Sequence, residues 1–187
     1  MISTSDIKRG VCFKLDGELF SVVEFQHVKP GKGGAFVRTK LKNIKRGTVL
    51  DRTFRSGEKL EDVRLEKTPM QYLYDEGDSL MFMNTESYEQ EAVPKDALGN
   101  AIKFIKPEDV VDITFYEGSP VSVEPPSSVV LKVIYAEPGV KGDTATNVLK
   151  PVKVETEAEV KVPLFINEGD LIKINTETGE YIERVNK

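Results

Sequence analysis

The sequence predicts an all-β protein built from three small β-barrels in series. Segments that alternate apolar and polar residues recur along the whole chain, and Gly, Asn and Asp turn signals separate them at short intervals. These segments divide into three stretches of similar size, and a proline-rich linker, Glu124-Pro-Pro-Ser-Ser128, precedes the third. We therefore predict domains at residues 1–64, 65–126 and 127–187. Barrels of this size enclose little space, so an internal catalytic pocket is not expected.

The first stretch shows the clearest strand pattern. Asp16-Gly17 is a strong hairpin turn signal between two alternating segments. A glycine-rich loop then separates the second strand from a third, and two shorter strands follow. The expected strands are residues 11–15, 19–25, 35–44, 48–50 and 53–57, the last including its turn.

The stretch His27–Phe36 has the character of a hairpin tip with Lys32 at its apex. Proline fixes φ and glycine permits positive φ, so both suit a tight loop. Residues of these two types surround the lysine, namely Pro30, Gly31, Gly33 and Gly34. Two interpretations are open: a flexible loop with a solvated lysine, or a finger that carries its amine into a site on another molecule.

A cationic stripe follows this loop. Arg38, Lys40 and Lys42 fall at period two in the predicted third strand, so they share one face, and the residues between them face a core. Residues 1–64 carry 14 Lys and Arg against 8 Asp and Glu, whereas residues 65–126 carry 4 against 13. A basic segment on a protein of net charge −5 suggests a polyanionic partner such as nucleic acid. The alternative is that these residues cover one solvated face.

The second and third stretches continue the strand pattern. Gly77 marks the turn of a hairpin in the second stretch, and one short segment, residues 101–105, is helix-like. The expected strands of the second stretch are residues 70–74, 79–83, 110–116 and 121–123. Those of the third stretch are residues 129–135, 152–154, 160–166, 171–174 and 181–185.

Composition argues against several classes of protein. No apolar run is long enough for a transmembrane helix, and the first residues lack the apolar core of a secretory signal, so a cytoplasmic protein is expected. Cys12 is the single cysteine, which rules out an intrachain disulfide, and it suits a small core residue better than a nucleophile. His27 is the single histidine and has no cysteine beside it to share a zinc ion.

The motifs of common enzyme sites do not fit. Gly31-Lys32-Gly33 lacks the spacing, the following Ser or Thr and the helix of a phosphate-binding loop. The chain has neither a parallel βαβ pattern nor a Gly-x-Ser-x-Gly motif. The carboxylates of residues 65–126 suit a solvated face. We therefore expect no catalytic residue, no metal site and no cofactor.

Seven motifs occur in order along nearly the full length of the chain, each weak alone and specific in combination. They are Lys29-Pro-Gly-Lys-Gly-Gly-Ala-Phe36, Tyr72-Leu-Tyr74, Phe82-Met-Asn84, Tyr88-Glu-Gln90, Pro138-Gly-Val-Lys-Gly-Asp-Thr-Ala145, Lys150-Pro151 and Val162-Pro-Leu-Phe165. In this combination the chain resembles the bacterial translation elongation factor P family. The third barrel distinguishes it from the two-domain eukaryotic and archaeal relative.

The resemblance implies an SH3/KOW-like first domain and two OB-fold-like domains in an L-shaped, tRNA-like arrangement. It implies a non-enzymatic factor that binds the ribosome beside the peptidyl-tRNA and promotes peptide-bond formation at stalled polyproline sequences. Lys32 would reach toward the acceptor end of that tRNA, and in many members a modifying enzyme lengthens the lysine at this position. The factor is expected to be a monomer.

The resemblance also assigns contact residues. Contacts to tRNA and ribosomal RNA fall on Lys29, Gly31, Lys32, Gly33, Arg38, Lys40 and Lys42. A loop of the third barrel would face the messenger RNA in the exit site, and it comprises Lys141, Gly142, Asp143 and Thr144. Tyr181 and Arg184 would lie on the small-subunit side. The chain departs from the family at Val152, usually alanine, and at Glu157, usually glycine, and the second departure is expected to change a turn.

Two other functions remain as alternatives. The first is a general RNA-binding OB-type module in which Lys32 has no special role. The second is a small β-barrel enzyme, although the chain shows no catalytic constellation to support it.

Overall fold

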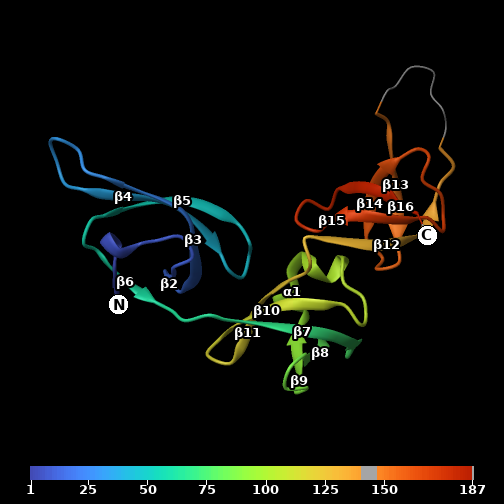
Figure 1. Ribbon diagram of the computed structural model, residues 1–187, viewed down its shortest axis with the longest axis horizontal. Helices are drawn as coiled ribbons and strands as arrows, with labels where there is room; N and C mark the ends of the chain where they lie inside the picture. Colours follow the sequence, from blue (N-terminus) through green and yellow to red (C-terminus); the bar gives the residue numbers. More distant parts are fainter. Residues whose placement is uncertain (140–146, 187) are drawn as a thin grey trace. The chain divides into compact units, whose positions relative to one another are not determined.

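A computed structural model describes residues 1–139 and 147–186 (Figure 1). Its strands form three separate sheets that follow one another along the sequence, which confirms the predicted all-β class and the three β-structures in series. Two compact units are present: residues 1–67 with 114–122, and residues 68–113 with 123–187. The domain boundaries at residues 64 and 126 stay a prediction. No helix in the described part of the chain is long and apolar enough to cross a membrane.

The first sheet has six strands in the order β1-β6-β2-β3-β4-β5. The strands are β1 (Ile2–Ser3), β2 (Cys12–Leu15), β3 (Glu18–Val28), β4 (Phe36–Asn43), β5 (Val49–Arg55) and β6 (Lys59–Asp62), and a 3-10 turn, η1 (Thr4–Asp6), follows β1. The prediction of two strands at 48–50 and 53–57 was wrong. β5 is one strand because it pairs with β4 without a break, from Lys42↔Val49 to Phe36↔Arg55.

Alternating side chains of these strands fill the first core. Phe13 is fully buried and meets Phe54 edge-on, with ring centroids 6.0 Å apart. The other buried members are Ile7, Phe20, Val22, Val37, Leu41 and Leu60. Burial raises the pKa of the Cys12 thiol at the start of β2, which fits a packing role better than a reactive one.

The second sheet has the strand order β11-β10-β7-β8-β9. Its strands are β7 (Glu66–Asp75), β8 (Ser79–Asn84), β9 (Gln90–Pro94), β10 (Val110–Tyr116) and β11 (Ser119–Glu124). The predicted turn at Gly77 is present with φ of 99°. At this turn, Gly77 N and Lys95 Nζ both donate hydrogen bonds to the Asp75 carboxylate. These bonds lower the pKa of Asp75, and the bond from Lys95 has the largest effect.

The helical segment begins earlier than predicted. It consists of α1 (Lys95–Leu98) and the 3-10 turn η2 (Gly99–Lys103), whereas the expected range was 101–105. Pro94 occupies the N-cap, with φ of −57°. Phe104 leaves helical geometry, and its ring packs into the core of the third sheet.

The third sheet has the strand order β14-β13-β12-β15-β16. Its strands are β12 (Ser128–Ala136), β13 (Leu149–Val154), β14 (Glu159–Pro163), β15 (Leu171–Asn175) and β16 (Tyr181–Val185). The edge strands β14 and β16 approach each other, so the sheet nearly closes on itself. Buried side chains of β12 to β15 and of the turn after β14 form one core, against which Tyr181 of β16 packs. Its fully enclosed members are Leu131, Val133, Val154, Val162, Ile166, Ile172 and Ile174.

The second and third sheets are joined through the segment 103–106. Phe104 belongs to the third core, Thr156 Oγ1 donates to the Lys103 carbonyl, and Lys106 Nζ lies 3.3 Å from Glu155 Oε1. In the turn between β13 and β14, Glu157 adopts the left-handed conformation, with φ of 69°. Its side chain forms an ion pair with Lys153 at 2.7 Å. A glutamate therefore adopts there the conformation that a glycine would favour.

Candidate nucleic-acid interface

The longest hairpin in the described part of the chain is formed by β3 and β4. The two strands pair from Phe20↔Asn43 to Val28↔Phe36, which leaves residues 29–35 as the connecting loop. Residues 24–27 of β3 are exposed, whereas Val37, which pairs with His27 from β4, is fully buried in the first core. The paired strands therefore stay on the core through β4, and the exposed loop beyond Val28 and Phe36 extends past it (Figure 1).

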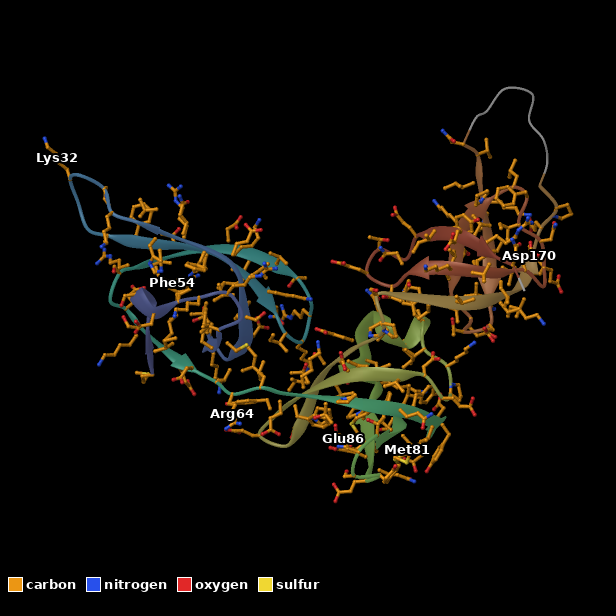
Figure 2. All side chains as sticks on the ribbon, in the orientation of Figure 1. Lys32, Phe54, Arg64, Met81, Glu86 and Asp170 are labelled. Atoms are coloured by element: carbon orange, nitrogen blue, oxygen red, sulfur yellow. The ribbon has the colours of Figure 1, made fainter. Side chains whose placement is uncertain are left out.

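Lys32 lies at the tip of this loop, and its side chain points away from the hairpin (Figure 2). Only Gly33 of the three tip glycines adopts positive φ, at 108°. A Cβ at either of those two positions would meet nothing within 4 Å. Among the described residues, neither Lys29 nor Lys32 has an ion-pair partner, so both amines are available to an external anion.

The predicted stripe is present on the outer face of β4. Arg38 and Lys42 are exposed and Lys40 is half-buried, while the intervening Val37, Thr39 and Leu41 are buried. Two side chains that the sequence analysis missed modify this stripe. Lys40 Nζ lies 3.3 Å from Glu24 Oε2, and the Arg38 guanidinium lies 5.4 Å from the centre of the Phe36 ring.

The residues of the stripe differ in how far their positive charge is compensated. Lys40 is opposed by Glu24 and, in register on β5, by Asp51, so its charge is partly compensated. Arg38 and Lys42 keep their charge open to solvent. Phe36 could have been found from the sequence, since residues 36 and 38 share a face of a strand. The Glu24 pairing depends on a bulge between Val22 and Glu24, which alternation does not reveal.

A shallow hollow of about 300 Å³ lies over the middle of β3, β4 and β5. It is lined by Glu24, Phe25, Gln26, Arg38, Thr39, Lys40, Asp51, Arg52 and Thr53. His27 packs edge-on against Phe25, with ring centroids 5.4 Å apart. Within the described residues, no group of three His, Cys, Asp or Glu side chains could hold a metal ion. The arrangement is suited to binding a polyanion through Lys and Arg side chains.

The other predicted contact residues lie on the third sheet. Tyr181 and Arg184 both belong to β16, opposite the core residues Ile174 and Ile172 of β15. The Arg184 guanidinium lies 5.4 Å from the centre of the Phe165 ring, a second contact that the sequence analysis did not anticipate. The predicted loop of Lys141, Gly142, Asp143 and Thr144 lies outside the described residues.

Three family models match the chain in sequence order. The elongation factor P (EF-P) KOW-like domain matches residues 3–60, the EF-P OB domain matches residues 65–123, and the C-terminal domain of elongation factor P matches residues 129–184. These matches confirm the KOW-like and OB-type folds that the resemblance implied.

Curated relatives match over nearly the full length. An elongation factor P of Acetivibrio thermocellus is 54% identical over 99% of this chain and 100% of its own length. One from Caldanaerobacter subterraneus is 55% identical over the same shares. Among solved structures, a eukaryotic translation initiation factor 5A from Methanococcus jannaschii shares the fold with a TM-score of 0.52 and 22% identity, over 66% of this chain and 91% of its own. The chain belongs to the elongation factor P family of translation factors.

Proposed function

We propose that the chain binds the ribosome beside the peptidyl-tRNA and promotes peptide-bond formation where synthesis stalls, above all at consecutive prolines. Its partners would be the peptidyl-tRNA, ribosomal RNA and the messenger RNA in the exit site. It would act in the cytoplasm as a monomer and without catalysing a reaction itself. The observation that carries the proposal is the unpaired Lys32 at the end of a long, exposed hairpin.

The cationic face behind the tip supports an RNA partner. Arg38 and Lys42 leave their charges open on β4, and Lys29 adds a third charge at the base of the loop. Such side chains contact phosphates and fix the register of a protein on RNA. The narrow loop of residues 29–35 could enter a confined RNA cleft, with Lys32 leading. The loop at Lys141–Thr144 would contact the messenger RNA, as the family resemblance implies.

The contribution of Lys32 would be orientation. Holding two reactants in productive geometry lowers the barrier without proton transfer by the protein. The ring of proline locks φ and contains the backbone nitrogen, so fewer orientations of the reacting groups are open to it. A cation that steadies the acceptor end of the tRNA would therefore help most at proline runs. A modifying enzyme that lengthens Lys32 would extend the reach of this cation.

A reconstituted translation system tests this proposal. The purified chain is added to ribosomes translating a template with three consecutive prolines or a matched template with alanines. We expect the rate of the proline–proline bond to rise by on the order of tenfold or more, equivalent to about 1.4 kcal/mol in the barrier, and the alanine template to change little. Ribosome binding without acceleration of either template would instead favour the general RNA-binding module.

A further inference from the structure

A phenylalanine and an arginine from distant parts of the third sheet form a stacked pair on its surface. The Arg184 guanidinium lies 5.4 Å from the centre of the Phe165 ring. Phe165 is 55% exposed, so one face of its ring is accessible to a neighbouring surface side chain. Arg184 Nη1 also lies 4.0 Å from Asp170 Oδ2, so two contacts fix the orientation of the guanidinium.

Both members of the pair lie next to residues that are buried in the third core. Phe165 follows β14 in a turn that the Ile166 N–H closes on the Pro163 carbonyl at 3.2 Å, and Ile166 itself is fully buried. Arg184 lies within β16, in register with the buried Ile172 of β15. The buried neighbours Ile166 and Ile172 therefore anchor the backbone of both partners.

The Arg184 side chain is open to solvent on one side. The Arg184 side chain is 45% exposed, and it borders a shallow hollow of about 260 Å³ with Asp170, Leu171 and Val185. The Asp170 carboxylate is already engaged, since Asp170 Oδ2 accepts from the Asn167 N–H at 2.9 Å. Arginine presents a planar set of donors that matches a phosphate, and a stacked arginine loses less freedom when it binds one.

We propose that Phe165 is a positioning residue that holds Arg184 for contact with a phosphate group of ribosomal RNA. The inference rests on the proposed function, because it assumes that the ribosome is the partner. It goes beyond that function by assigning a role to an exposed phenylalanine and by naming phosphate as the group that Arg184 contacts.

A double-mutant cycle on ribosome affinity tests the pairing. We expect Arg184→Gln to weaken binding by on the order of tenfold and to lower the slope of log affinity against log salt by about 1. Phe165→Ala should weaken binding roughly two- to fivefold in the parent and not at all in the Arg184→Gln background. Phe165→Tyr keeps the ring and should bind like the parent. In a parallel NMR measurement, the Arg184 Nε–H should become more mobile in Phe165→Ala and not in Phe165→Tyr.

Several outcomes would overturn this inference while leaving the proposed function intact. One is that the Phe165→Ala variant binds ribosomes as tightly as the parent. Another is that its loss of ribosome affinity adds fully to the loss caused by Arg184→Gln. An unchanged salt slope for Arg184→Gln would exclude a phosphate contact and favour a protein carboxylate. A parent chain that did not bind ribosomes would overturn both the proposed function and this inference.

Discussion

Lys32→Ala should abolish the acceleration of peptide-bond formation at proline runs, a loss of on the order of tenfold or more that returns the rate to that without the factor. Lys32 has no partner among the described residues and lies at the tip of the β3–β4 hairpin (Figure 2). Its removal therefore changes neither the core nor the fold. Ribosome affinity should fall much less, because the charges of Arg38, Lys42 and Lys29, which we propose contact phosphates, are unchanged.

The matched control for Lys32→Ala is Lys45→Ala. Lys45 is also exposed and belongs to the same basic segment, but it follows the opposite end of β4, after Asn43. The Lys45→Ala variant should accelerate peptide-bond formation at proline runs as well as the parent does. If Lys32→Ala accelerated the proline template as well as the parent does, the tip would have no special role and the general RNA-binding module would be preferred. The intact mass of protein from its native source would show whether Lys32 carries an added group.

Phe13→Ala should destabilise the first sheet by about 3–5 kcal/mol, a large part of the stability of a small domain. Phe13 is fully buried and makes the edge-on contact with Phe54, so its truncation leaves a cavity in the core beneath the hairpin. Hydrogen exchange of the β2, β3 and β4 amides, followed by mass spectrometry, would report the loss locally.

The matched stability control for Phe13→Ala is Phe25→Ala. Phe25 lies on the same sheet but is 41% exposed, so its truncation should cost well under half as much. Equal protection of the first-sheet amides in the Phe13→Ala variant and the parent would show that the core does not depend on this ring. Faster exchange in the Phe25→Ala variant than in Phe13→Ala would contradict the burial pattern directly.

The strands of the hairpin were predictable because their alternation is strong. Arg38, Lys40 and Lys42 alternate with buried Val37 and Leu41 on β4, which fixes the face of the stripe from sequence alone. The prediction was wrong at β5, because Asp51 suggested a break between two strands. Continuous pairing with β4 keeps this segment as one strand.

Long-range contacts account for most of what the sequence did not reveal. The helix was misplaced because Phe104 belongs to the core of the third sheet, a contact that local periodicity does not encode. The pairing of Arg184 with Phe165 likewise joins residues of different strands and turns. By contrast, Lys32 was recognisable because glycines and a proline leave a lysine with nothing to pack against.

The central claim is that Lys32 lies beside the acceptor end of the peptidyl-tRNA, and directed RNA cleavage tests it most directly. In a Cys12→Ala background, Lys32→Cys carries a tethered iron chelate that generates hydroxyl radicals on the ribosome. Arg64→Cys serves as the matched control, since it is exposed and lies far from the tip within the same compact unit (Figure 2). We predict strand cleavage at the acceptor end from position 32 and none there from position 64. An uncut acceptor end with the chelate at position 32 on a bound factor, or equal cleavage from both positions, would contradict the claim.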